Sequence, residues 1–366
     1  MGYDVIIAGA SFAGLAVASR LRGKVLLLEP HAIGEHQTSA CAIPLSVAEK
    51  LGLMDSVLRV LRRLVIHARS SKMVVDLSAH PYCTVDYKKF CCGMAAGVRA
   101  EVLRAHVLGR ERNRVATTRG SFEGEILVDA SGWRAVLAGR KGTRVSRRKF
   151  LSFGIETVAA KAGDKLGFWS DLGILFRGFA WDFPIDTGSR IGLASYVDDH
   201  RLRGPLEIFL ARWGLARGEI HGGYFTSALR APIEQDLFLV GDAAGQCLPL
   251  TGEGIRPAIY FGQACGAVIQ RILNGELTLE AGREVYESFV LRHQRLYRAL
   301  RFAQSLGVKL PPRFTSFLLA LACTGPSLSY ILPRYMALAD TNNLHAARGS
   351  ELQGKVHRSR GRAASC

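Results

Sequence analysis

The most specific chemical pattern in this sequence is a group of glycines that follows Asp242 and its neighbour Gly241, between an apolar run and a helix of small residues. Its members are Gly241, Asp242, Gly252, Gly254 and Ile255. The apolar run at 237–240 predicts a buried strand, and a helix is predicted from about residue 256 onward. Glycines let a backbone approach a ligand closely, and the first N–H groups of a helix carry partial positive charge. The pattern predicts a cradle for a polyol-phosphate chain, because an ordinary strand–turn–helix corner needs neither these glycines nor the acid.

A related pattern opens the chain. Apolar runs predict a strand at 4–8, a helix at 12–21 and a second strand at 25–28. The turn after the first strand, and the acid that ends the second, are formed by Gly9, Ser11, Gly14 and Glu29. This spacing fits the dinucleotide-binding fingerprint, with Ser11 where the second glycine usually stands. Serine is small enough for a pyrophosphate to approach, and Glu29 would accept hydrogen bonds from a ribose diol.

The two patterns together resemble the FAD motifs of the hydroxylase-like flavoproteins. In that superfamily, the acid at the position of Asp242 binds the flavin ribitol, and the turn at 252–255 lies beside the isoalloxazine ring. The strand that ends at Asp129 also matches the superfamily, in which this acid is structural and near the flavin. Two positions depart from the pattern, since the superfamily usually has Arg where Tyr87 stands and Asp where Cys91 stands.

Within this superfamily, the chain resembles the geranylgeranyl reductases. The matching aromatic motif consists of Phe179, Trp181, Phe183 and Pro184. In the family this motif lines a tunnel for a polyprenyl chain, although the same alternation would suit a strand in a sandwich core. The polar segment around Cys41 matches a cysteine-containing loop that faces the flavin in the family. The resemblance therefore implies that Cys41 is catalytic, the alternative being a small buried filler.

The resemblance implies an α/β fold with a Rossmann-like FAD-binding domain of the glutathione-reductase type. It also implies an inserted antiparallel β-sheet substrate domain and a C-terminal helical region. We assign residues 1–44, 84–149 and 231–275 to the FAD domain, 45–83 and 150–230 to the substrate domain, 276–340 to the C-terminal helices, and 341–366 to a disordered basic tail. In the substrate domain we expect strands at 64–69, 73–77, 151–159, 165–169, 173–177, 179–184 and 190–196. A strongly helical pattern covers 277–308.

Composition limits the partners of this 366-residue chain. Its net charge of +17 favours nucleic acid, an anionic membrane surface or an anionic ligand. No motif with interleaved aromatic residues indicates nucleic acid, so we expect none to bind. Arg292, Arg295, Arg298 and Arg301 recur at helical spacing and form a basic stripe, which is either solvated or faces a membrane. The apolar run at 314–323 is too short to span a bilayer, so we expect peripheral contact with an anionic membrane.

The cysteines indicate the compartment. The chain has eight of them, without the spacing of a zinc site, and we expect them to be mostly free thiols in a reducing environment. A strand that begins near residue 4 leaves no room for a signal peptide. These features predict a cytoplasmic protein, located peripherally on the cytoplasmic face of the membrane.

The reaction that the resemblance implies is the saturation of C=C bonds in geranylgeranyl or other polyprenyl chains by hydride transfer from reduced flavin. The substrate would be a prenyl lipid or a prenyl diphosphate. No second glycine fingerprint for NAD(P)H is present, so the external reductant is either NAD(P)H that binds transiently or a ferredoxin-type electron-carrier protein. Two alternatives stay open: an FAD-dependent monooxygenase on the same scaffold, and a flavin-binding protein without turnover.

Overall fold

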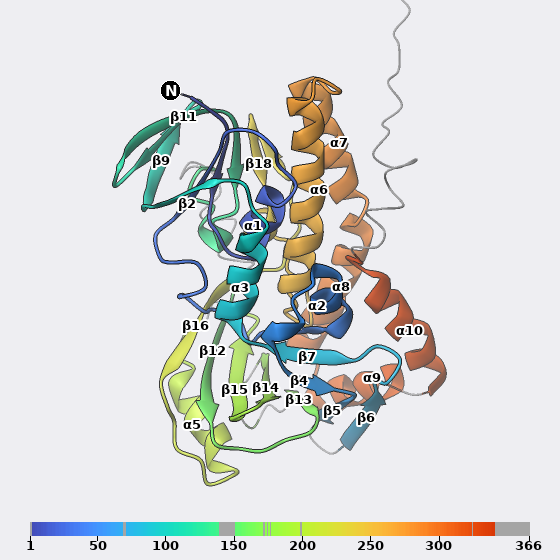
Figure 1. The fold of residues 1–366 in the computed structure, drawn as a ribbon. Coiled ribbons are helices and arrows are strands. Elements are labelled where there is room, and N and C mark those ends of the chain that lie inside the picture. The colour runs from blue at the N-terminus through green and yellow to red at the C-terminus, as the bar shows by residue number, and fades with distance from the viewer. Residues whose placement is uncertain are drawn as a thin grey trace, which may run out of the picture.

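The computed structural model describes residues 2–68, 71–138, 151–170, 173, 175, 177–197, 200–323 and 325–340. The predicted tail at 341–366 and residues 139–150, around the predicted boundary between the FAD and substrate domains, lie outside the described residues. Within the described chain, two large sheets lie one below the other, and helices run along one side of both (Figure 1).

The upper sheet, here called the cradle sheet, has eight strands within the described chain. They are β1 (Tyr3–Ala8), β2 (Val25–Glu29), β8 (Glu101–Arg104), β9 (Val107–Glu111), β10 (Arg114–Thr117), β11 (Gly120–Asp129), β17 (Ile233–Glu234) and β18 (Leu237–Leu239). β1 is central and runs parallel to β2 and β11, and β8 and β18 extend the parallel part. Parallel pairing brings the ends of β1, β2 and β11 to one edge, which places Gly9, Glu29 and Asp129 there.

Both faces of the cradle sheet are covered, which explains why β1 and β2 read as continuous apolar runs. Val5 and Ile7 face a core shared with the helices α1 (Phe12–Ala18) and α6 (Ile255–Leu273). Ile6 and Ala8 face a second core on the side of the antiparallel strands β9 and β10.

Glycines allow α6 to pack closely against α1. A methyl group added at Gly262 would lie 2.7 Å from the Cβ of Ala16, and one added at Gly266 would lie 2.4 Å from the carbonyl oxygen of Val17. Both distances are far below van der Waals contact, so neither position accepts a side chain without moving the helices apart. The small-residue helix expected from the sequence is therefore a packing requirement that fixes α6 over the first turn.

The lower sheet, here called the wall sheet, has seven strands among the described residues. In sheet order they are β16 (Ile220–Thr226), β12 (Leu151–Ala159), β15 (Gly188–Ser195), β14 (Gly178–Ile185), β13 (Leu166–Ser170), β5 (Arg63–Ala68) and β6 (Ser71–Asp76). Neighbours are antiparallel, except that β5 and β13 pair in parallel. One face packs on the helix α5 (Arg203–Ala211).

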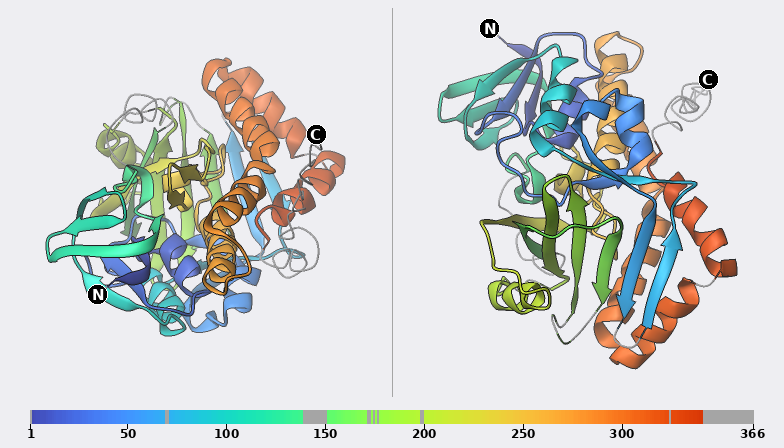
Figure 2. Two further views of the ribbon diagram at one scale, coloured as in Figure 1. Left: turned by 90° about the horizontal axis from the view of Figure 1, so that it is seen from above. Right: turned by 60° about the horizontal axis from the view of Figure 1, so that its bottom comes forward.

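The remaining described elements lie outside the two large sheets. The strands are β3 (Ala42–Pro44), β4 (Val57–Leu61) and β7 (Tyr82–Val85). The helices are α2 (Leu45–Leu51), α3 (Tyr87–Ala96), α7 (Leu279–Leu291), α8 (Gln294–Lys309), α9 (Pro312–Ala322) and α10 (Gly325–Ala337), and 3₁₀ turns lie at Met54–Ser56, Gly132–Arg134 and Gly241–Ala244. α8, α9 and α10 run down to the side of the wall sheet where β5 and β6 lie (Figure 2). No helix of the described chain is long and apolar enough to cross a membrane.

The structure differs from the expected secondary structure in three places. The strand expected at 173–177 is wrong, because Gly173, Leu175 and Arg177 lie in turns and irregular chain; Leu175 is apolar because it fills the core under α5. The strand β16 was not expected, since its two glycines weaken the strand pattern. The helical pattern at 277–308 is two helices, α7 and α8. We keep the predicted domain boundaries as a proposal.

The first testable prediction concerns a turn glycine of the cradle. Gly245 and Gly52 share the same left-handed backbone, with φ of +67° and +68°. A methyl group at Gly245 would lie 2.0 Å from the carbonyl oxygen of Ala228, whereas one at Gly52 would meet no atom within 4 Å. We expect Gly52→Ala to lower the free energy of unfolding by about 1 kcal/mol and Gly245→Ala by about 3 kcal/mol or more. Urea unfolding measures both, and equal losses would contradict the close approach.

Candidate functional site

The first glycine turn is fixed by the close approach of two chain segments. Gly9 has φ of +103°, and a methyl group there would lie 2.4 Å from the carbonyl oxygen of Ala130, just after β11. A methyl group at Gly14 would lie 1.9 Å from the carbonyl oxygen of Gly9. The two glycines therefore let the turn fold back on itself and on the end of β11. A turn this tight leaves backbone N–H groups at the edge of the sheet.

Glu29 holds the same turn. Its Oε2 accepts a hydrogen bond from the backbone N–H of Ala10 at 2.8 Å, and its Oε1 accepts a long one from His31 at 3.3 Å. The side chain is only partly buried. Glu29 thus positions the turn and still presents carboxylate oxygen toward a diol. Binding of a ribose by Glu29 stays a prediction.

The two unusual residues of the first FAD motif and the third helix contact each other. Ser11 stands where a glycine was expected, and its Oγ lies 3.2 Å from the hydroxyl of Tyr87, which stands where an Arg was expected. The ring of Tyr87 packs edge-on against Phe12, with 5.5 Å between centroids. Residues 76 positions apart in sequence thus form one neutral hydroxyl pair beside the turn, in place of a cation.

Asp129 has a structural role that the sequence anticipated. Its carboxylate is fully buried and accepts hydrogen bonds from the N–H and Oγ of Ser131 and from the N–H groups of Leu137 and Ala138. Burial raises its pKa, although these donors act against the rise. Because its oxygens already have four donors, Asp129 fixes the loop after β11, and direct contact with a cofactor stays a prediction.

Asp242 differs from Asp129 in having fewer partners. It lies in the 3₁₀ turn after β18, and the donor to its carboxylate among the described residues is the backbone of Thr226. Burial raises its pKa to about 7, although this donor acts against the rise. A desolvated carboxylate with one protein donor keeps acceptor sites for a ligand that brings hydroxyl groups. This is the property expected of an acid that binds a polyol.

Gln246, which the sequence did not single out, shapes the turn around Asp242. Its Oε1 accepts a hydrogen bond from Gly241 N–H at 2.6 Å, and the hydroxyl of Tyr297 donates to its backbone oxygen at 2.6 Å. Gln246 is completely buried. A fully buried amide that bonds the turn glycine is a positioning group, and a single polar residue in this stretch gave no sequence signal for it.

The second glycine turn meets the wall sheet. Gly252 has φ of +67°, and a methyl group there would lie 3.3 Å from Cζ of Phe179 and 3.6 Å from the ring of Phe225. Gly254 is the N-cap of the 19-residue helix α6, and its lack of a side chain leaves the first N–H groups of the helix without a capping bond. Ile255 begins the helix and is buried. The start of α6 is therefore open to a ligand at the place where the two sheets meet.

A buried ion pair, also missed by the sequence analysis, ties this turn to the end of the described chain. Arg256 donates from Nε and Nη2 to the two carboxylate oxygens of Glu253, at 2.6 and 2.8 Å. Its Nη1 donates to backbone oxygens at the C-terminal end of α10, including that of Met336 at 2.8 Å. The hydroxyl of Tyr335 on α10 donates to Glu253 and, at 3.0 Å, to Thr251. The backbone partners of Arg256 on α10 lie about 80 positions away, so no sequence pattern indicated this link.

The aromatic motif lies on one face of the wall sheet. This aromatic wall consists of Phe168, Phe179, Trp181 and Phe183. Phe179 is central, with ring centroids 5.5 Å from Phe168 and 5.8 Å from Trp181. Pro184 is buried at the end of the same strand, and its backbone oxygen accepts a hydrogen bond from Thr84 at 2.7 Å. The wall thus lies next to the Gly252 turn through Phe179, and its role as a tunnel lining stays a prediction.

Cys41 lies between the wall and the cradle core. Its neighbours Ala40 and Ala42 pack against the aromatic wall, whereas its own side chain is buried in the core that includes α1. Its backbone is left-handed, with φ of +54°, which is uncommon for a residue with a side chain and clusters at functional sites. Burial raises the pKa of the thiol to about 12, so the thiol is protonated at neutral pH. In this arrangement Cys41 can hold a proton but does not line an open cavity.

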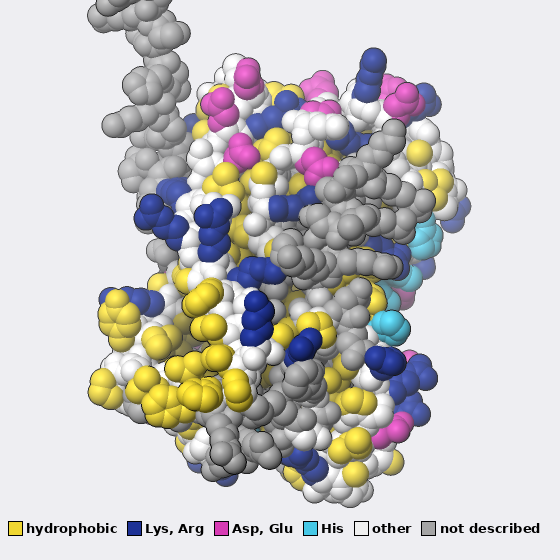
Figure 3. All heavy atoms as spheres, turned by 180° about the vertical axis from the view of Figure 1, so that it is seen from behind, with side chains coloured by type: hydrophobic (Ala, Val, Ile, Leu, Met, Phe, Trp, Pro, Cys, Tyr) yellow, Lys and Arg dark blue, Asp and Glu magenta, His cyan; other side chains and the backbone are white. Residues whose placement is uncertain are grey.

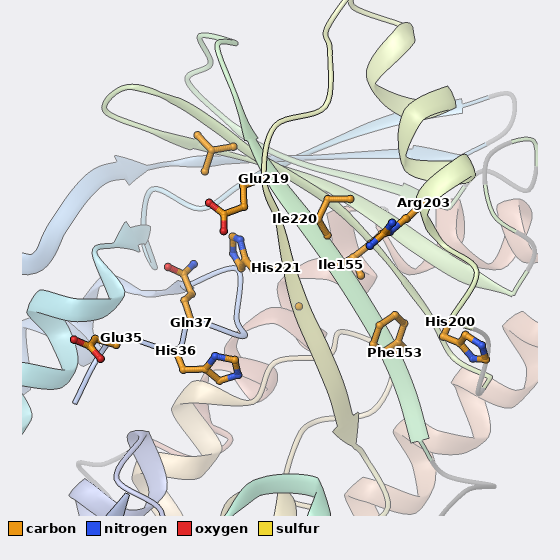
Figure 4. A pocket seen from close by; sticks show the side chains of 12 residues that line it. Glu35, His36, Gln37, Phe153, Ile155, His200, Arg203, Glu219, Ile220 and His221 are labelled. Carbon is orange, nitrogen blue, oxygen red and sulfur yellow. The ribbon is translucent and has the colours of Figure 1, made fainter. Parts of the chain in front are cut away.

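A cavity of about 880 Å³ opens beside β16, at the edge of the wall sheet (Figure 4). Its described lining includes Gln37 and His221 but none of the residues predicted for the site. His221 Nε2 lies 2.6 Å from Glu156 Oε1, and Trp181 Nε1 donates to Glu156 Oε2 at 3.0 Å. Glu156 is almost completely buried, so it links the cavity to the indole of the aromatic wall. The only sequence signal for it was an acid inside an apolar strand.

These residues fit an extended FAD. Two glycine turns lie at the ends of β1 and β18 in one parallel sheet, which places both on the same edge. Glu29 is available at the first turn, and the Asp242 carboxylate, with one backbone donor, keeps acceptor sites at the second. The Ser11–Tyr87 pair places neutral hydroxyl groups, in place of an Arg, where a pyrophosphate would lie. Ser11 is small enough for a pyrophosphate to approach the backbone of this turn closely.

The chain was compared with known proteins. No protein-family model matches it. The digeranylgeranylglycerophospholipid reductase of Methanocaldococcus jannaschii is 26% identical over 310 residues, which cover 74% of this chain and 78% of that protein. The digeranylgeranylglycerophospholipid reductase 2 of Methanothermobacter thermautotrophicus is 26% identical over 332 residues, covering 81% and 84%. The chain is similar to the digeranylgeranylglycerophospholipid reductases. The resemblance stated from the motifs is thereby confirmed, and the predicted oxidoreductase class agrees with the names of these reductases.

Solved structures confirm the predicted fold class. A geranylgeranyl bacteriochlorophyll reductase-like protein from Thermoplasma acidophilum matches with a TM-score of 0.79 at 17% identity, over 94% of this chain and 99% of that protein. The FAD-dependent chondrochloren halogenase of a myxobacterium matches with a TM-score of 0.65 at 18% identity, over 89% and 90%. At these identities the likeness shows the fold, which the reductase-like protein and the FAD-dependent halogenase share.

We expect the affinity for FAD to depend on pH through Asp242. If FAD hydroxyls donate to its carboxylate, binding lowers the pKa from about 7, so affinity is full above about pH 7 and falls as the pH decreases through that value. We expect Asp242→Asn to weaken FAD binding by about tenfold at about pH 8 and to remove this part of the pH dependence. Titration of deflavinated protein with FAD, followed by flavin fluorescence, measures both.

The control for this experiment is Glu123→Gln, which removes an exposed acid of β11 at the far end of that strand. It should bind FAD as the unchanged chain does. A pH dependence that persists undiminished in Asp242→Asn would show that Asp242 does not contact the cofactor.

Proposed function

We propose that this chain is an FAD-dependent reductase that saturates C=C bonds of polyprenyl chains, with a prenyl lipid or a prenyl diphosphate as its substrate. The observation that carries the proposal is the meeting of the aromatic wall with the Gly252 turn at the start of α6. The names of the curated relatives, which are reductases of a digeranylgeranyl lipid, support the same substrate class.

Each part of the site has a role in this reaction. FAD, when bound and reduced, would supply the hydride that one alkene carbon receives, while a proton must reach the other carbon. An isolated alkene has no carbonyl to polarise, so the chain contributes by orienting the substrate and excluding water. The rings of Phe179 and its neighbours provide a rigid apolar surface for this purpose. Glu29 would hold the ribose at the adenosine end of the cofactor, and Asp242 would hold its ribitol.

Cys41 is the proposed proton donor. Its thiol is protonated at neutral pH and its Sγ donates to the backbone oxygen of Ser39 at 3.2 Å. Arg190, which donates to the backbone oxygens of Ala40 and Val85, favours the thiolate that would remain after proton transfer and acts to lower the pKa. Since the thiol faces the core in the described structure, the segment around it has to turn toward the wall for the transfer.

A matched pair of cysteine variants tests this role. We expect Cys41→Ala to lower turnover by about 100-fold while FAD stays bound, because a positioned general acid contributes about this much. Cys83→Ala, which removes an equally buried thiol of β7, is the control and should leave turnover unchanged. Steady-state rates and the flavin absorbance of the purified proteins are measured. Equal rates for Cys41→Ala and the unchanged chain would remove Cys41 from the reaction.

The reaction itself is tested by lipid mass spectrometry. Expression of the chain in a host with polyprenyl lipids should add hydrogen in steps of about 2 Da per double bond, also without oxygen. Oxygen consumption with addition of oxygen atoms would identify the monooxygenase alternative, and a purified flavoprotein whose flavin cannot be reduced would identify the alternative without turnover. Assays with NAD(P)H and with reduced ferredoxin distinguish the two proposed electron donors.

A further inference from the structure

We propose that α8, α9 and α10 form a docking surface for an anionic lipid bilayer. The surface presents exposed apolar side chains on helices that do not span a membrane. Its apolar members are Phe302, Phe314, Phe317, Leu318, Leu321, Tyr330 and Ile331. The use of this surface, to bring a lipid chain to the aromatic wall, rests on the proposed function, whereas binding to a bilayer does not.

The exposure of these side chains is unusual for the molecule. Phe302, Phe314 and Phe317 are 66%, 61% and 64% exposed, and they are the phenylalanines with high exposure among the described residues. Figure 3 shows hydrophobic side chains gathered in the lower left of this face, with Lys and Arg side chains beside them. Other exposed apolar side chains are scattered over the molecule, whereas these are concentrated on one surface, and such a concentration marks an interaction site.

The charge of this region identifies the partner as an anionic surface. From Ser288 to Ala339 the sequence has no Asp or Glu, while seven basic residues occur there: Arg292, Arg295, Arg298, Arg301, Lys309, Arg313 and Arg334. Arg295, Arg298 and Lys309 of α8 and Arg334 of α10 are exposed. Exposed apolar side chains together with basic ones on short amphipathic helices fit the interface of an anionic membrane. A second copy of this chain fits poorly, because its own surface is equally basic and its net charge is +17.

The surface continues into the proposed substrate site. Leu328 and Leu332 of α10 pack against the core that includes the aromatic wall, whereas Tyr330 and Ile331 of the same helix are exposed. One helix therefore separates the bilayer surface from the wall. The C-terminal end of α10 is held by Arg256 beside the Gly252 turn, so the position of the surface is fixed relative to the cradle.

Vesicle binding tests the proposal with the full chain loaded with FAD. Phosphatidylcholine vesicles containing about 30% phosphatidylglycerol, with saturated chains that the reductase cannot change, are compared with pure phosphatidylcholine in a sedimentation assay. The chain should bind the anionic vesicles. Phe314→Ser combined with Phe317→Ser should lower the partition coefficient by about tenfold or more, and Arg295→Gln combined with Arg298→Gln should remove most of the preference for anionic lipid.

The matched control is Leu108→Ser combined with Ile208→Ser, which removes two apolar side chains of similar exposure, 68% and 58%, on other elements. It should bind as the unchanged chain does. Equal binding by the phenylalanine variant, or no binding of the unchanged chain to anionic vesicles at low salt, would overturn the proposal. So would a dimer in light scattering that the phenylalanine variant dissociates. Because the vesicles hold no substrate, a lack of reductase activity would leave the binding result intact.

Discussion

The geometry of the candidate site depends on one buried ion pair, Glu253 with Arg256, beside the second glycine turn. Both side chains are almost completely buried, 8% and 3% exposed, so each needs the other to offset the loss of water. Arg256 also binds the end of α10, and Tyr335 returns a hydrogen bond to Glu253. The start of α6, the turn beside the wall and the C-terminal helices are therefore positioned as one unit. A change in α10 would be transmitted to the turn through the guanidinium group of Arg256 and the hydroxyl of Tyr335.

Local patterns in the sequence predicted most of the cradle. Gly9, Gly14 and Gly252 were recognisable because a close approach or a left-handed turn excludes side chains, and that requirement appears in the residue type itself. The strands of the parallel sheet were recognisable because both of their faces are buried. The placement of Asp242 at the end of β18 followed from the strand before it. For these features, the physical cause lies within a few residues of the feature.

The residues that were missed also have partners far away in sequence. Gln246, Glu156 and Arg256 are ordinary polar residues until the fold brings Tyr297, Trp181 and the end of α10 to them. The strand β16 was missed because it pairs with β12 through glycines, of which Gly222 approaches the backbone of Gly154 directly. The contact between Ser11 and Tyr87 was also hidden in the sequence. Each residue could be seen to differ from the usual FAD motif, but only the fold shows that the two residues contact each other.

The order of strands in the cradle sheet has a consequence for how the protein is made. Along the chain, β1 is soon followed by its neighbour β2, but its other neighbour β11 comes about 120 residues later, and β18, which pairs with β11, comes about 230 residues after β1. During translation, one side of β1 is therefore an unpaired strand edge until β11 is made, and one side of β11 is unpaired until β18 is made. Edges of this kind attract foreign strands. We expect the nascent chain to depend on chaperones until the segment with Asp242 emerges. The segment that completes the cradle also covers the strand edge of β11 that was unpaired until then.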